Sequence, residues 1–144
     1  MTAEELWEKS GLTGEYDAWA FGDDADRLAE LVKKGIKTAT SSLLCLYELE
    51  DEELPKVGEY NIILDSRDEA VCIIRTTKVY VTAFDKISEE HAFKEGEGDR
   101  ILEYWKKVHS SYFAEELEEI GKTFNTGLEI VCEEFEVVKC GECP

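Results

Sequence analysis

Two short segments of this sequence hold residues whose types and spacing could support chemistry. The first, residues 95–99, alternates Glu95, Glu97 and Asp99 with two glycines just before a helical pattern. Glycine permits a positive φ or a close approach of the backbone, while three carboxylates make an anion site at the following helix start unfavourable. They could hold a divalent cation, because hard cations take oxygen ligands. The simpler interpretation is a loop that positions Glu95 and caps a helix, and we expect no metal here.

The second segment, residues 35–40, joins the end of a helical pattern to the start of a strand-like run. A lysine enclosed in a cleft loses solvation, so we expect the pKa of Lys37 to fall toward neutrality. Side chains alternate along a regular strand, and Lys37 and Thr40 would then point to opposite faces. If they are to converge, the chain must take an irregular step around Thr38 and Ala39. We therefore predict that the strand proper begins near Thr40.

The five cysteines do not form a disulfide framework, because an odd number cannot pair completely within one chain. Cys45, Cys72 and Cys132 lie among apolar residues in expected strands, which favours buried free thiols and a reducing cytosol. Cys140 and Cys143 form a single C-x-x-C at the tail. A closed zinc site would need two further ligands, and none has the spacing for it.

Length and composition favour one domain over residues 1–144, with its core at about residues 7–138 and a tail at residues 139–144. A hydrophobic fraction of 43% argues against global disorder. The sequence has no run of about 18 apolar residues, which argues against a membrane span. The acidic, amphipathic start lacks the basic and apolar stretches of a secretory signal. We therefore expect a cytoplasmic protein.

The formal net charge of -18 works against nonspecific binding of DNA or RNA, because it repels the phosphate backbone. Recognition of a single nucleoside remains open, since one site can be locally basic. Lys33, Lys34 and Lys37 lie close together in an otherwise acidic chain.

Patterning predicts the order helices, strands, helices and a last strand, which is an α+β arrangement with an antiparallel sheet that can close on itself. Capping residues and apolar positions three or four apart indicate the helices. Runs of alternating apolar residues bounded by turn residues indicate the strands. We expect helices near residues 2–7, 24–35, 88–91, 99–108 and 110–121, and strands at residues 38–46, 60–64, 70–77, 78–84 and 128–138.

The chain resembles the longer bacterial ASCH proteins from about Trp7 to Val138. The motifs that carry the resemblance, in order and spacing, are WAFGD at 19–23, GIKTAT at 35–40, and EGEGD at 95–99 with Tyr104-Trp105. The resemblance implies a PUA-like, small, mostly antiparallel β-barrel with surrounding α-helices. It also implies a cleft between barrel and helices, and an association with RNA or modified nucleosides.

A short member of the family is an amidohydrolase that removes the acetyl group of N4-acetylcytidine with a Lys, a Thr and a Glu. The resemblance implies Lys37, Thr40 and Glu95 as the matching catalytic residues, without metal or cofactor. Lys37 would take the proton of Thr40, whose hydroxyl would attack the amide carbonyl. Glu95 would orient Lys37 or pass a proton to the leaving amine. A structural Lys–Glu pair beside a strand threonine is the alternative.

The expected substrate-binding residues are Trp19, Asp23, Thr38, Ser41 and Arg75. Trp19 could stack on a base, and Asp23 could accept a hydrogen bond from an amine edge; otherwise they are a core tryptophan and a helix cap. Arg75 could pair with a ligand phosphate or with Glu95, or lie exposed on a strand. The competing functions are an RNA-binding module and a ribonuclease that uses the same cleft. The sequence leaves the choice of free nucleoside or RNA, and the oligomeric state, open.

Overall fold

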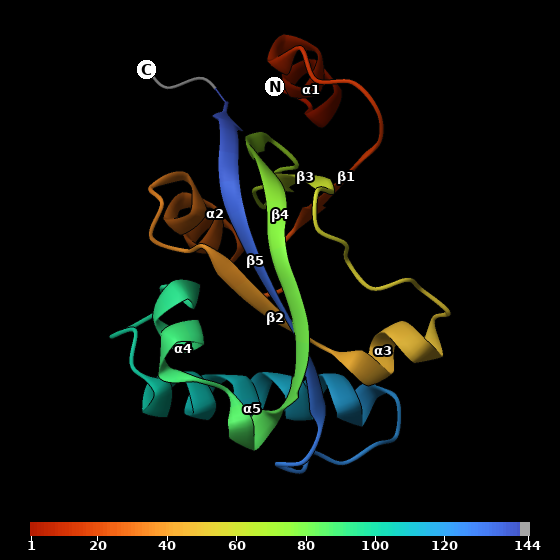
Figure 1. Ribbon diagram of the computed structural model, residues 1–144, viewed down its shortest axis with the longest axis vertical. Helices are drawn as coiled ribbons and strands as arrows, with labels where there is room; N and C mark the ends of the chain where they lie inside the picture. Colours follow the sequence, from red (N-terminus) through yellow and green to blue (C-terminus); the bar gives the residue numbers. More distant parts are fainter. Residues whose placement is uncertain (142–144) are drawn as a thin grey trace.

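The computed structural model describes residues 1–141 and places one curled five-stranded sheet among its helices (Figure 1). The order across the sheet is β1-β3-β4-β5-β2. β1 and β3 run parallel, and the other neighbouring strands run antiparallel. The strands are β1 (Tyr16–Ala20), β2 (Ala39–Leu43), β3 (Tyr60–Leu64), β4 (Ala70–Ala83) and β5 (Glu129–Cys140). The α+β class and the mostly antiparallel sheet are confirmed.

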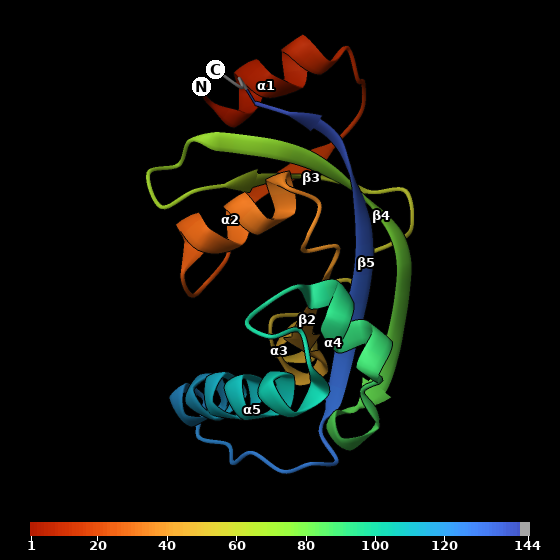
Figure 2. The same ribbon diagram turned by 90° about the vertical axis from the view of Figure 1, so that its left-hand side faces the viewer.

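The curvature of the sheet comes from its two longest strands, β4 and β5, which pair along most of their length. Their register shifts twice, between Ile73 and Ile74 and between Thr76 and Lys78. Such bulges bend a strand and increase its twist. Figure 2 shows β4 and β5 arching around one concave side, so that the sheet forms a half-barrel.

Helices cover both ends of this half-barrel. Two of the helices are capped by nearby side chains. At the start of α1, Thr2 and Glu5 form a capping box, and at the start of α4 the Ser88 hydroxyl accepts a hydrogen bond from the His91 backbone N–H. The helices are α1 (Ala3–Ser10), α2 (Ala25–Lys33), α3 (Leu44–Leu49), α4 (Glu89–Glu95) and α5 (Leu102–Glu119), with a 3-10 turn, η1, at Phe84–Lys86. Among residues 1–141, no helix is both long and apolar enough to cross a membrane.

The structure corrects four element predictions. β2 ends at Leu43, and the expected continuation to residue 46 is the helix α3, because Leu44–Leu49 is rich in good helix formers. Residues 70–83 form one strand, since the bulge after Thr76 preserves pairing with β5. Ser110 does not restart a helix; its hydroxyl donates to the Lys107 carbonyl, three residues back in the continuous α5. The strand β1 was not predicted.

The cysteines within residues 1–141 are free thiols. Cys72 and Cys132 are buried on strands as expected, whereas Cys45 is half-buried and lies on the helix α3. β5 extends to Cys140, two residues beyond the predicted end. Cys143, the other half of the C-x-x-C, lies outside the described residues, so the prediction about that pair stays a prediction.

Three hydrophobic clusters hold the layers together. α1 packs Leu6 and Trp7 against the outer part of β3 and β4, and α2 packs Val32 against the middle of the sheet. α5 packs Trp105, Phe113 and its neighbours against the far end of β2 and β5. In Figure 2, α2 and α5 consequently face each other across the concave side of the half-barrel.

Gly96 ends α4 in a left-handed conformation with a φ of 73°. A Cβ at this position would lie 2.6 Å from the Ile36 carbonyl oxygen, on the segment that leads to β2. Gly121 has the same φ of 73°, but nothing within 4 Å of an added Cβ. A comparison of the two positions therefore separates the cost of a left-handed backbone from the cost of close packing.

We predict that Gly96→Ala lowers the free energy of unfolding more than Gly121→Ala does. Gly121→Ala should cost about 1–2 kcal/mol for the left-handed backbone alone, and Gly96→Ala should add about 1–3 kcal/mol for the overpacking. Urea unfolding of both variants and the parent measures the difference. Equal losses in the two variants would contradict the close approach of α4 to Ile36.

Candidate functional site

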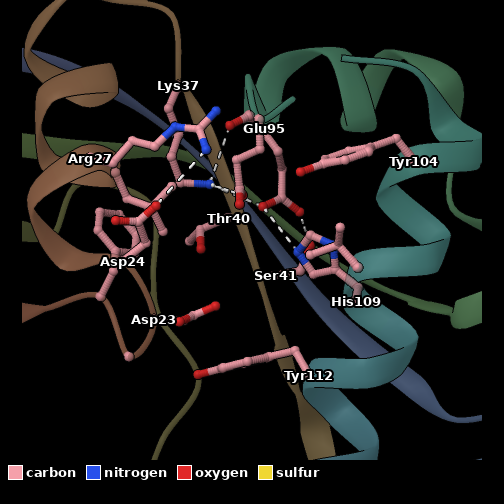
Figure 3. Close-up of a pocket in the computed structure, with 15 residues that line it drawn as sticks. Asp23, Asp24, Arg27, Lys37, Thr40, Ser41, Glu95, Tyr104, His109 and Tyr112 are labelled. Atoms are coloured by element: carbon pink, nitrogen blue, oxygen red, sulfur yellow. Dashed lines mark hydrogen bonds and ion pairs between the residues drawn. The ribbon is translucent and has the colours of Figure 1, made fainter. Parts of the chain in front are cut away.

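A cavity of about 200 Å³ opens between α2 and α5 at the start of β2. Four regions far apart in the sequence meet here: the loop after β1, the first turn of α2, the entry to β2 and the α4–α5 region (Figure 3). The lining residues are Phe21, Gly22, Asp23, Asp24, Arg27, Leu28, Lys37, Thr40, Ser41, Glu95, Glu97, Tyr104, Val108, His109 and Tyr112.

Lys37 is the cation at the centre of this cavity, and its side chain is 1% exposed. Its Nζ donates to Oε1 of Glu95 at 3.0 Å, to the backbone carbonyl of Glu95 at 3.3 Å and to Oε2 of Glu97 at 3.1 Å. An ammonium has three N–H donors, so each proton has an acceptor. The Phe21 ring centroid lies 5.4 Å from Nζ and covers another side of the charge.

Glu95 is the anion that faces Lys37, and it is also 1% exposed. While Oε1 contacts Lys37, Oε2 accepts from the Ser41 hydroxyl at 2.5 Å and from the Trp105 indole N–H at 2.5 Å. Nε2 of His91 lies 3.1 Å from the same oxygen. A buried charge is tolerated only when it is paired and hydrogen-bonded. Glu95 meets both conditions, and donors from three elements fix its position.

The pKa of Lys37 is shifted in the direction opposite to the one expected from the sequence. Burial by itself lowers the pKa of Lys37, but the carboxylates of Glu95 and Glu97 together outweigh it, and the pKa is raised above its usual value. Burial by itself raises the pKa of Glu95, but Lys37 and the nearby imidazoles of His109 and His91 reverse this, and the pKa lies well below its usual value. In the free cavity Lys37 is therefore an ammonium and Glu95 a carboxylate. The predicted fall of the Lys37 pKa toward neutrality is wrong, because the lysine has two carboxylate partners.

Thr40 and Lys37 line the same cavity. β2 begins at Ala39, one residue before the predicted start. Lys37 precedes the strand: its backbone N–H donates to the Leu31 carbonyl at 3.1 Å, at the end of α2. The alternation rule therefore applies to Thr40 but not to Lys37, and the irregular step lets both side chains converge. The Thr40 side chain makes no hydrogen bond within residues 1–141, and Figure 3 shows it pointing into the cavity.

Of the expected substrate-binding residues, the structure places Asp23 and Ser41 in the cavity lining. Trp19 lies outside this lining, because its indole N–H donates to the Asn61 side chain at 2.8 Å and its ring packs edge-on against Phe21. Phe21, two residues later, is the aromatic residue of this segment that lines the cavity.

Thr38 and Arg75 also lie outside the cavity lining. The Thr38 hydroxyl donates to the Lys94 carbonyl at 3.4 Å, which ties β2 to α4. Arg75 is 46% exposed on β4 and forms an ion pair with Glu136, the residue opposite it on β5. The expected lysine cluster does not form a basic patch either, since Lys37 is buried and Lys34 pairs with Glu30 on α2.

Sequence reasoning missed several residues of the cavity. Tyr104, Val108 and Tyr112 lie four residues apart on one face of α5, a spacing that predicts one lining stripe. His109 stacks on Trp105 with ring centroids 4.1 Å apart, and its Nε2 lies 3.6 Å from Glu95. Burial by itself lowers the pKa of His109, but Glu95 and Glu97 reverse this and the pKa is raised.

Possible ligand atoms of Glu95, Glu97 and His109 lie within 4.8 Å of one another, close enough to surround a cation. The Lys37 ammonium already contacts both carboxylates, at 3.0 and 3.1 Å. A metal ion would have to displace a buried charge that has an acceptor for each proton. The donor set therefore fits the lysine rather than a metal.

The comparisons with known proteins agree with this architecture. The family model described as ASCH domain matches residues 17–139. An ASCH domain from Lactobacillus crispatus JV V101 is 32% identical, with a TM-score of 0.84 over 96% of this chain and 87% of that one. Protein EF3133 from Enterococcus faecalis V583, family-model DUF984, is 41% identical, with a TM-score of 0.86 over 95% and 85%. A ZmASCH variant from Zymomonas mobilis, 9% identical with a TM-score of 0.50 over 84% and 67%, shares the fold alone. A search of curated proteins found no match.

We predict that Glu95→Gln lowers the free energy of unfolding by about 3–5 kcal/mol at neutral pH, because it removes one partner of a buried ion pair. The folded-state pKa of Glu95 is lowered from the usual 4.5. Its contribution is therefore fully present above pH 4.5 and is lost as the pH falls through the folded-state pKa. Urea unfolding at a series of pH values should show the parent and the variant converging in acid.

Glu103→Gln, an exposed change in the first turn of α5, is the matched control for the loss of one negative charge. Its unfolding free energy should stay within about 0.5 kcal/mol of the parent. A difference between Glu95→Gln and the parent that stayed constant down to strong acid would show that Glu95 does not titrate as the partner of Lys37.

Proposed function

Because this chain belongs to the ASCH domain family, we propose that its cavity hydrolyses an acyl amide on a modified nucleoside such as N4-acetylcytidine. The observation that carries the proposal is the convergence of the Lys37 ammonium and the unbonded Thr40 hydroxyl on one small cavity, with Glu95 fixed behind the lysine. These are the three residues that the resemblance to the short amidohydrolases implies.

The size and lining of the cavity suit one base. About 200 Å³ is below the roughly 300–1,000 Å³ of sites for drug-sized ligands. Phe21, Tyr104 and Tyr112 offer aromatic surfaces on which a base can stack. Asp23 lies at the same cavity and can accept a hydrogen bond from an exocyclic amine.

The proposed reaction uses Thr40 as the nucleophile. Its oxygen attacks the amide carbonyl carbon while its proton moves to a neutral Lys37, and the tetrahedral intermediate then expels the cytidine amine. The leaving nitrogen takes a proton from Lys37, whose position Glu95 holds. Water then hydrolyses the Thr40 ester and releases the carboxylic acid. Since Lys37 is charged in the free cavity, it must lose a proton before it can accept that of Thr40.

Charge favours an uncharged nucleoside over a nucleic acid strand. Four carboxylates line the cavity, from Asp23, Asp24, Glu95 and Glu97, against the cations Arg27 and Lys37. The whole chain carries a formal charge of -18. Both features repel a phosphate backbone. An RNA-binding module and a ribonuclease are therefore the weaker proposals.

We predict that the protein converts N4-acetylcytidine to cytidine without added metal. Lys37→Ala, Thr40→Ala and Glu95→Ala should each lower kcat/KM by about 100-fold or more, since each removes a group that acts in the transition state. Chromatography of the nucleosides measures turnover. Thr40→Ser keeps the hydroxyl and should retain part of the activity.

Thr77→Ala, at an exposed threonine on β4, is the control and should match the parent. Circular dichroism and thermal unfolding separate loss of activity from loss of fold in the three variants. If the folded parent does not turn over N4-acetylcytidine, this substrate is wrong. RNA titration at several salt concentrations and RNA cleavage with Lys37→Ala then decide between the two other proposals.

A further inference from the structure

One of the three acceptors around Lys37 differs from the other two. The carbonyl and the carboxylate of Glu95 belong to the last residue of α4 and are buried, with the side chain 1% exposed. The Glu97 side chain is 21% exposed and lies on the loop between α4 and α5. Within residues 1–141, the Glu97 carboxylate makes one ion pair, which is the one with Lys37. Glu97 can therefore leave Lys37 for solvent without breaking another ion pair, whereas Glu95 cannot.

The glycines on either side of Glu97 set its position in the loop between α4 and α5. Gly96 and Gly98 have φ values of 73° and 59°, in the left-handed region that glycine adopts at little cost. A Cβ on Gly98 would lie 2.3 Å from the Tyr104 ring in the cavity wall. The turn therefore holds Glu97 at the cavity rim, between the buried end of α4 and the aromatic face of α5.

We propose that Glu97 is a positioning residue, a counter-ion at the cavity rim that stabilises the ammonium of Lys37 in the free protein and must leave it before Lys37 can accept the proton of Thr40. The second half of this proposal rests on the proposed function. The first half concerns the free protein and needs no substrate.

The proton balance of the step is simple. Nζ of Lys37 gives one proton to Oε2 of Glu97, 3.1 Å away, and both groups become neutral. The Glu97 side chain then turns outward and releases this proton to water. Lys37 keeps Glu95 as its remaining carboxylate partner, and its free lone pair can take the Thr40 proton as the oxygen attacks the carbonyl.

The other charged groups around Lys37 are less suited to this role. Glu95 on α4 is fixed by donors from Ser41 and Trp105. His109 on α5 lies 3.6 Å from Glu95 and within 4.8 Å of Glu97, so it faces both carboxylates that bind Lys37. At the start of α2, the N-cap residue Asp24 lies 3.9 Å from Arg27, so these two charges offset each other at the opposite wall. The buried His91 contacts the far oxygen of Glu95.

The test is a titration of Lys37 by NMR in the full chain, with lysine labelled with ¹³C and ¹⁵N and the signal assigned by its loss in Lys37→Met. Glu97→Gln keeps an acceptor but removes the charge, so the pKa of Lys37 should fall by about one pH unit or more. Glu97→Asp keeps the carboxylate and should restore a pKa closer to that of the parent. Glu103→Gln removes an exposed charge nearby and should leave the Lys37 pKa unchanged.

A Lys37 pKa in Glu97→Gln equal to that in Glu103→Gln would overturn the proposal. In the hydrolysis assay, Glu97→Gln should shift the acid limb of the kcat/KM profile to lower pH by the same amount as the Lys37 pKa. The reason is that Lys37 then loses its proton at a lower pH. An unshifted limb in an active enzyme would also overturn it. If the parent does not hydrolyse N4-acetylcytidine, the proposed function fails alone, and the titration still decides whether Glu97 is the counter-ion.

Discussion

The buried ion pair of Lys37 and Glu95 is the interaction that orders the rest of the site. Removing two charges from water is costly, and their attraction offsets the cost only when the remaining hydrogen-bonding groups are satisfied. Here the three protons of Lys37 and both oxygens of Glu95 have partners. These partners come from β2, from the end of α4 and the loop after it, and from the first turn of α5. The pair therefore adds polar links between three segments that also share one hydrophobic cluster, through Leu43, Ala92 and Trp105.

The half-barrel positions those segments. β2 is the edge strand that pairs with β5. The helices α2 and α5 lie on the concave side of the sheet, one toward each end of the half-barrel. The chain passes from α2 to β2 through an irregular step tied to Leu31 and Lys94 by backbone hydrogen bonds. This step turns Lys37 inward, beside the first residues of a strand whose alternation places Thr40. Two bulges in β4 bend the sheet enough for α5 to reach the same point.

The parts of the fold and of the candidate site that could be predicted from the sequence are those that depend on residues close together in the chain. The caps at Thr2 and Ser88 depend on residues three positions apart, which are visible without the fold. Strand alternation likewise shows from the sequence that Lys37 and Thr40 can converge only if the chain takes an irregular step before the strand. The predicted direction of the Lys37 pKa was wrong because two carboxylates, those of Glu95 and Glu97, contact Lys37 from 58 and 60 residues away along the chain. The single helix α5 was missed because Ser110 was interpreted as a cap, whereas its hydroxyl donates to the Lys107 carbonyl within the helix. The stripe of Tyr104 and Tyr112 is visible from its spacing, but its place at the cavity depends on the tertiary fold.

Two hydroxyls stand beside the ion pair, and their surroundings give them different roles. The Ser41 hydroxyl lies 2.6 Å from Nε2 of His91 and 2.5 Å from Glu95, which places a hydroxyl, an imidazole and a carboxylate together. In a catalytic triad the carboxylate holds the ring nitrogen opposite the serine. Here Glu95 and Ser41 contact the same nitrogen, while Nδ1 of His91 has no partner within residues 1–141. Ser41 therefore serves to fix Glu95, and the hydroxyl of Thr40, which makes no such bond, is the one free to act on a ligand.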